Sequence, residues 1–157
     1  MKYLPILGLA LILLAQAPAV YALDDAAALH GLTAVRAVYD VRTNDEKSLQ
    51  FMFKVIRDTY DETRAQNVTP RYVVSMRGPT VKMLVRSRAG DADLQAQTVA
   101  IIRSLIDRDI RLEACGYALN LFGVGPDALY KGVNAVGNSL NSLIGYQTRG
   151  YALVPMY

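Results

Sequence analysis

The sequence predicts an α/β domain in which a mainly parallel sheet is covered by helices on both faces. Short segments rich in Val, Ile and Tyr alternate with longer segments whose apolar residues recur at helical spacing. Strands that alternate with helices in this way form parallel sheets. The 157 residues contain no internal repeat, low-complexity stretch or linker, which favours one domain.

The first predicted strand and helix lie between residues 36 and 65. Residues 36–41 are rich in Val and Tyr, which favours a strand. Thr43-Asn-Asp-Glu46 follows directly and matches the capping box, in which the Thr and Glu side chains bond free amides at a helix start. The apolar residues beyond it form one stripe at helical spacing: Leu49, Met52, Phe53, Ile56 and Tyr60. They predict a helix that ends near Ala65.

A second strand and helix follow. Residues 72–76 predict the strand, and Arg77-Gly-Pro79 ends it. Residues 80–88 fit either a short helix or an irregular loop. Asp91 is a suitable cap for the second long helix. Its stripe consists of Leu94, Thr98, Ile101, Ile102 and Leu105.

The last third of the chain repeats the alternation on a smaller scale. The expected elements are a strand at 110–114, one or two helical turns at 117–122, a strand at 133–136, a helix capped by Asn138 and ended by Gly150, and a strand at 151–154.

The first 22 residues resemble a secretory signal peptide. Lys2 supplies the positive start, and Ile6 to Ala15 form an apolar run that is shorter than the about 20 residues of a membrane span. We expect cleavage after Ala22, with Ala17 as the alternative site; an uncleaved anchor is the less favoured interpretation. The mature protein is then periplasmic or secreted and has no stable membrane insertion. Residues 23–34 are expected to form a flexible lead-in, and residues 35–157 the domain.

Composition excludes several classes of function. The formal net charge of +3, which falls by one when Lys2 is removed, is too small for a nucleic-acid binder. One His and one Cys do not make a metal-ligand cluster, so we expect neither a metal nor a cofactor.

The lone cysteine, Cys115, is the main candidate for chemistry. It cannot form a disulfide within the chain, so in an oxidising compartment it is buried and inert, paired with another chain, or a working thiol. It follows a predicted strand and precedes a helical turn, where the free amides near Gly116 and Tyr117 favour an anion and lower a thiol pKa. Ligands of parallel sheets also bind beyond the carboxyl ends of the strands.

A basic segment follows the second strand and is the other candidate. Arg77 and Lys82 are expected at the same sheet edge as Cys115, where they would stabilise an anionic sulfur. The alternatives are a solvated surface and a loop that packs against another subunit.

Four segments resemble the DsrE/DsrF-like family, and together they extend the resemblance over residues 35–157. They are Ala37–Val41, Ile110–Leu119 with its cysteine, Val133–Val136, and Gln147–Val154 with its Gly-Tyr-Ala strand. The resemblance implies a flavodoxin-like three-layer sandwich with a mainly parallel five-stranded sheet, assembled as a homo-oligomer, often a trimer or hexamer. It also implies that Cys115 matches a cysteine that carries sulfane sulfur as a persulfide. The members that traffic sulfur are cytoplasmic, whereas the start of this chain resembles an export signal, so we expect different partners.

Three functional hypotheses follow. The first is a periplasmic sulfur-trafficking protein that takes sulfane sulfur from a donor onto Cys115 and passes it to an acceptor thiol protein without a cofactor. The alternative is a non-catalytic oligomeric binding or scaffold protein in which Cys115 is structural. A third is a redox sensor that dimerises through Cys115.

Overall fold

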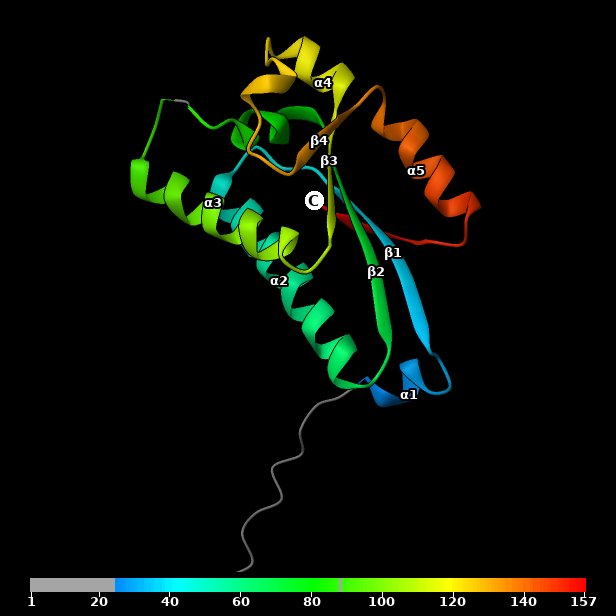
Figure 1. Cartoon of the computed structure of the whole chain (residues 1–157). Coiled ribbons are helices and arrows are strands. Elements are labelled where there is room, and N and C mark those ends of the chain that lie inside the picture. The colour runs from blue at the N-terminus through cyan, green and yellow to red at the C-terminus, as the bar shows by residue number, and fades with distance from the viewer. Residues whose placement is uncertain (1–24, 88) are drawn as a thin grey trace, which may run out of the picture.

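The computed structural model describes residues 25–87 and 89–157, so the expected signal segment 1–22 and its cleavage site lie outside the described residues. Five parallel strands form one sheet in the order β4-β3-β2-β1-β5 (Figure 1). They are β1 (Ala34–Val41), β2 (Thr69–Met76), β3 (Arg111–Cys115), β4 (Val133–Val136) and β5 (Ala152–Met156). The predicted parallel five-stranded sheet is thereby confirmed, and every pairing in it is parallel.

Helices cover both faces of this sheet (Figure 1). The α-helices are α1 (Ala26–Leu29), α2 (Glu46–Ala65), α3 (Ala92–Ile106), α4 (Gly116–Leu121) and α5 (Ser139–Thr148), and the 3₁₀ helices are η1 (Gly78–Leu84) and η2 (Pro126–Ala128). The chain steps from β1 to β4 in one direction and then returns to place β5 beside β1. Because crossovers between parallel strands are right-handed, this reversal puts α5 on the face opposite to α2 and α3.

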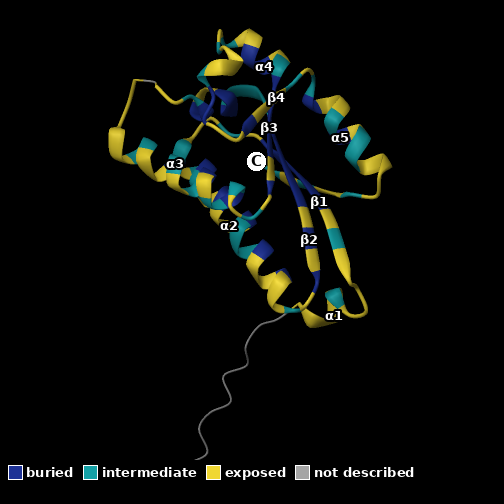
Figure 2. Cartoon of the chain, viewed as in Figure 1, coloured by how far each residue is buried: buried dark blue, intermediate teal, exposed yellow. Residues whose placement is uncertain are grey.

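The hydrophobic core is larger on the α2–α3 face of the sheet than on the α5 face. On the α2–α3 face a large cluster includes the fully buried Phe53, Val74 and Leu112. On the α5 face a small cluster contains Val38, Val73 and Leu143. Figure 2 shows the buried middle of the sheet and the exposed outer surfaces of the helices. None of the helices in the described part of the chain is long and apolar enough to cross a membrane.

Two of the three predicted helix starts are confirmed. The carboxylate of Asp91 accepts hydrogen bonds from the amides of Asp93 and Leu94, and the side chain of Asn138 accepts one from the amide of Leu140.

The predicted capping box at Thr43 is wrong. The cap of α2 is Asp45, whose carboxylate accepts from the amide of Ser48 at 2.7 Å. The Thr43 hydroxyl instead accepts from the Asp45 amide at 3.1 Å, and the Thr43 backbone exchanges two hydrogen bonds with the Thr80 hydroxyl. Tertiary contact with η1 therefore shifts the start of α2 beyond Thr43. The segment left open between helix and loop contains this 3₁₀ helix, η1.

Candidate functional site

Cys115 ends β3 at the point where the chain changes from one face of the sheet to the other. The next helix, α4, contacts η1, and its Ala118 and Leu119 join the core cluster of the α2–α3 face. The helix after β4, α5, lies on the opposite face (Figure 1). Such a switch point opens a crevice at the carboxyl ends of the strands, which is where open α/β sheets bind ligands.

Gly116 lets the two helix starts come together. A Cβ atom at this position would lie 2.7 Å from the carbonyl oxygen of Val136 and 2.9 Å from that of Gly137. Only glycine allows α4 to begin this close to the loop between β4 and α5. That loop leads directly into Ser139, the first residue of α5, which contacts the Cys115 sulfur.

Several donors converge on the sulfur of Cys115. The residue is buried, with 5% of its surface exposed, and burial alone raises the pKa of the thiol. The Ser139 hydroxyl and the amides of Ser139, Ala118 and Tyr117 lie around the sulfur and stabilise its anionic form, which outweighs burial, so the pKa of Cys115 is lowered from its ordinary value. The arrangement therefore favours the thiolate, which is the nucleophilic form of cysteine.

A buried polar layer lies beside Cys115 on the α5 face. Within the described part of the chain, three buried side-chain oxygens make no hydrogen bond: Ser75 Oγ, Glu113 Oε2 and Ser139 Oγ. Ser75 and Glu113 are opposite each other on β2 and β3, and Glu113 shares its face of β3 with Cys115. Unpaired polar groups in a protein interior are costly and mark places of functional interest.

The other oxygen of Glu113 is well bonded. Its Oε1 accepts from Arg111 Nε at 2.6 Å and from the Tyr146 hydroxyl at 2.8 Å. The carboxylate thus ties α5 to β3, two residues before Cys115. Burial and the hydrogen bond to Glu113 raise the pKa of Tyr146, which keeps this phenol protonated and donating.

Arg77 lies at the same sheet edge as Cys115, since the preceding residue, Met76, pairs with Ala114. Its guanidinium donates two hydrogen bonds of 2.8 and 2.7 Å to the buried carboxylate of Asp40, which also accepts one from the Tyr157 hydroxyl. Burial opposes the charge of Asp40, but these bonds prevail, so the pKa of Asp40 is lowered. The observed contacts of Arg77 are thus with Asp40, and its role toward anionic sulfur stays a prediction.

The other predicted anion-stabilising residues are differently placed. The amide of Tyr117 lies near the sulfur and helps to lower the pKa of Cys115, while the side chain of Tyr117 is 74% exposed. Lys82 lies over the ring of Phe122 with its Nζ 5.1 Å from the centroid, at the far end of α4. Gly116 acts through the close approach described above.

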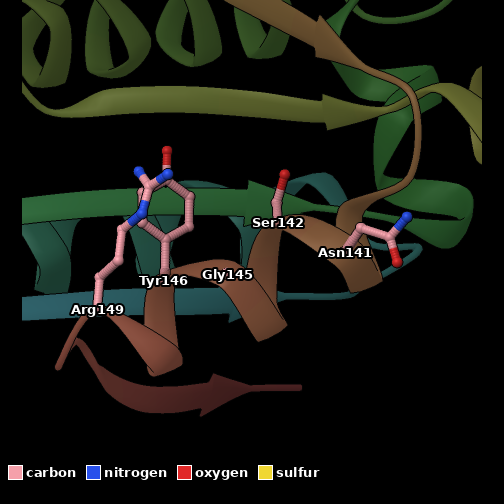
Figure 3. Close-up of a pocket in the computed structure, with 5 residues that line it drawn as sticks. All are labelled: Asn141, Ser142, Gly145, Tyr146 and Arg149. Carbon is pink, nitrogen blue, oxygen red and sulfur yellow. The ribbon is translucent and has the colours of Figure 1, made fainter.

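A groove runs along α5 beside this site (Figure 3). Its cavity of about 280 Å³ is lined by Asn141, Ser142, Gly145, Tyr146 and Arg149. Sequence reasoning missed this groove, as it missed Ser139 and Glu113. The available signals were the predicted cap at Asn138, which places Ser139 at a helix start, and the alternation along β3, which places Glu113 on the face of Cys115. The described residues hold no group of three or more metal-binding side chains.

Three solved structures share this architecture. The protein of unknown function MTH1491 from Methanobacterium thermoautotrophicum is 21% identical with a TM-score of 0.64, and the match covers 77% of this chain and 98% of that one. The ychN protein from E. coli is 14% identical (TM-score 0.57; 79% and 98% covered), and BT1422 from Bacteroides thetaiotaomicron, also of unknown function, is 15% identical (TM-score 0.53; 78% and 94% covered). At these identities the likeness shows the fold alone.

No curated protein matches the sequence. The model of the DsrE/DsrF-like family, however, matches residues 30–156, which includes the whole sheet and Cys115. The chain therefore belongs to the DsrE/DsrF-like family.

Proposed function

We propose that this protein is an exported sulfur carrier that holds sulfane sulfur as a persulfide on Cys115. The observation that carries the proposal is the position of the Cys115 sulfur at the switch point of a parallel sheet, where a hydroxyl and three backbone amides of the two adjoining helix starts surround it and lower its pKa. Membership of the DsrE/DsrF-like family supports a role in sulfur relay in general. The apolar run at the start of the sequence supports export.

The proposed transfer has two steps. The Cys115 thiolate attacks the outer sulfur of a donor persulfide, R–S–SH; the new S–S bond forms as the donor S–S bond breaks, and RS⁻ leaves and takes a proton from water. An acceptor thiolate then attacks the outer sulfur of the Cys115 persulfide, and the Cys115 thiolate is released. The donors around Cys115 stabilise the anionic sulfur at both ends of the cycle. The two sulfur exchanges balance without any further oxidant or reductant.

The assembly is proposed to be a homo-oligomer, a trimer or hexamer. Large apolar side chains are exposed on β5 and on α2, among them Leu153, Phe51 and Val55. A surface of this kind is typical of a contact with another protein chain.

Mass spectrometry after incubation with inorganic polysulfide tests the carrier function. The wild-type protein should gain sulfur on Cys115, and treatment with a reducing agent should remove it. The Cys115→Ser variant should gain none. Identical spectra for the two proteins, with no added sulfur, would contradict the proposal.

The near-complete burial of Cys115 favours a second candidate, a binding or scaffold protein in which the cysteine only packs. Native alkylation separates the two. A working thiol reacts with iodoacetamide in the folded protein below the ordinary cysteine pKa, whereas a structural one reacts only after unfolding.

A further inference from the structure

The groove along α5 combines a single positive charge with several uncharged hydrogen-bonding groups. Figure 3 shows the side chains of Ser142, Tyr146 and Arg149 extending to the same side of the helix. Residues 141, 145 and 149, like 142 and 146, are one helical turn apart, so they form a continuous strip along α5. Gly145 keeps the middle of the strip open because it has no side chain.

Arg149 supplies the charge at the far end of the strip. Its side chain is exposed and makes no hydrogen bond or ion pair within the described part of the chain, although its backbone carbonyl accepts from Arg36. A guanidinium of this kind binds carboxylates through paired hydrogen bonds. By contrast, Arg111 and Arg77 are both bonded to buried carboxylates.

The strip is also aligned with Cys115. Tyr146, which lines the strip, donates to Glu113 on the same face of β3 as Cys115, and α5 begins at Ser139, next to the sulfur. At 1.5 Å per helical residue, Arg149 lies about 15 Å along α5 from Ser139. An extended tripeptide spans about 10 Å, and its cysteine side chain adds further reach.

We propose that the groove binds the carboxylate-bearing end of a small peptidic persulfide, with Arg149 holding the carboxylate and the sulfane sulfur directed to Cys115. The inference rests on the proposed function and names the donor class for it. The cavity of about 280 Å³ lies just below the usual range of small-molecule pockets, about 300–1,000 Å³, so it suits a ligand of tripeptide size or less. Asn141, Ser142 and Tyr146 offer the amide and hydroxyl groups that a peptide backbone bonds. The transfer itself is the first of the two sulfur exchanges above, and the peptide thiolate is the leaving group.

Two variants test the groove without touching Cys115 or its donors. Arg149→Gln removes the charge, and Gly145→Leu fills the cavity. A Cβ atom at Gly145 meets nothing within 4 Å, and glycine is the weaker helix former, so the second change should not destabilise α5. Arg64→Gln is the matched control, because Arg64 is an exposed arginine in the last turn of α2, on the opposite face of the sheet.

The measurement is the rate constant of sulfur loading on Cys115 from two donors. Glutathione persulfide carries carboxylates, and 2-mercaptoethanol persulfide has the same reacting group without them. Arg149→Gln and Gly145→Leu should each slow loading from glutathione persulfide about tenfold. For Arg149→Gln this is the loss expected when one charge-assisted contact is removed. Loading from the uncharged donor should stay within about twofold of the wild-type rate in both variants. Arg64→Gln should resemble wild type with both donors.

The outcomes separate the inference from the proposed function. Equal rates for wild type and both groove variants with glutathione persulfide would overturn the inference and leave the carrier function standing. If neither donor loads the wild-type protein, the carrier function fails, and a second measurement still decides on the groove. Titration of S-methylglutathione into the Cys115→Ser protein should show binding that Arg149→Gln abolishes, and absence of binding there would overturn the inference.

Discussion

The sulfur of Cys115 lies among polar groups of two helices, α4 and α5, that are separated in the sequence by the whole of β4. The amides of Tyr117 and Ala118 belong to its own helix, α4. The hydroxyl and amide of Ser139 come from α5, on the other face of the sheet. The Ser139 hydroxyl is buried and makes no hydrogen bond within the described part of the chain, and its proximity to the sulfur contributes to the lowered pKa of Cys115. Ser139 thus has the features of a residue that positions and stabilises the thiolate.

Ser139→Ala should make the thiol less reactive. Loss of a hydroxyl that stabilises the anionic sulfur raises the thiol pKa and lowers the thiolate fraction at pH 7, by about tenfold if the interaction contributes about 1.4 kcal/mol. The measurement is the rate of alkylation by iodoacetamide between pH 5 and 10, where wild type should reach half its maximal rate below the ordinary cysteine value. Ser142→Ala, one turn further along α5, is the control and should leave the profile unchanged. An unaltered profile in Ser139→Ala would show that its hydroxyl does not act on the sulfur.

Arg77→Met should destabilise the fold by about 3 kcal/mol, because it leaves the buried carboxylate of Asp40 without its charged partner. The pKa of Asp40 is lowered in the folded protein, so its contribution is present above the ordinary Asp pKa and is lost as pH falls through the lowered value. In the variant, burial without Arg77 raises the pKa of Asp40. The ionised carboxylate then destabilises the fold at pH 7, and protonation at lower pH relieves this cost. Urea unfolding at pH 7 and pH 4 should therefore show a smaller difference between variant and wild type at pH 4.

Arg57→Met is the matched control for this ion pair. Arg57 pairs with the partly exposed Asp58 at 2.8 Å, and such surface pairs contribute about 0–1 kcal/mol. Similar losses of unfolding free energy in the two variants would mean that the Asp40–Arg77 pair stabilises the fold no more than a surface ion pair does.

Cys115 could be singled out as a candidate from the sequence because the signals that point to it are local. A strand, a cysteine and a helical turn follow one another in the sequence, and strand ends are where such sheets bind ligands. Ser139 and Glu113 could not be assigned the same way. Their proximity to the sulfur depends on which helix crosses to which face, and that is decided by the strand order.

At the scale of elements, the site depends on how closely α4 approaches the loop between β4 and α5. Gly116→Ala should push the two apart, since its Cβ would lie within 3 Å of two backbone carbonyl oxygens that have no flexible end to move. We expect a loss of about 1–3 kcal/mol in unfolding free energy and slower alkylation of Cys115, because Ser139 moves with the loop.

Gly137→Ala provides the control in the same loop, because a Cβ at Gly137 meets nothing within 4 Å. It should keep both the stability and the alkylation rate of wild type. Stability and reactivity measured together decide the matter, and a Gly116→Ala protein equal to wild type in both would contradict the close approach.

Long elements were predictable because their pattern repeats over many residues. The apolar stripes of α2 and α3 identify both helices, and the strands follow from their β-branched and aromatic residues. Single contacts were less predictable. The sequence around Thr43 fits a capping box. The Thr43 backbone, however, is hydrogen-bonded to Thr80, 37 positions away, and Asp45 caps α2 instead. A tertiary contact outweighs a local preference here, as it commonly does at helix ends.

At the scale of the whole molecule, the outer edge of the sheet at β5 carries no charged residue. The strand reads Ala-Leu-Val-Pro-Met, and its Leu153 is exposed, as are Phe51 on α2 and Tyr157 after the strand. Edge strands of monomers are usually protected by charges or by covering segments. Pro155 removes one backbone donor from this edge, so we expect a second copy to contact it through side chains rather than by extending the sheet.

Leu153→Lys should therefore dissociate the assembly. Sedimentation of the wild-type protein should give a trimer or hexamer, and the variant a monomer, because a charge on a buried apolar contact must be desolvated without a partner. Leu121→Lys places the same charge on α4, whose Leu121 is also exposed, and should leave the assembly intact. Dissociation by Leu121→Lys alone would move the interface to the end of the sheet that holds Cys115. A monomeric wild-type protein would contradict the proposed oligomer and leave the exposed edge without a second copy to cover it.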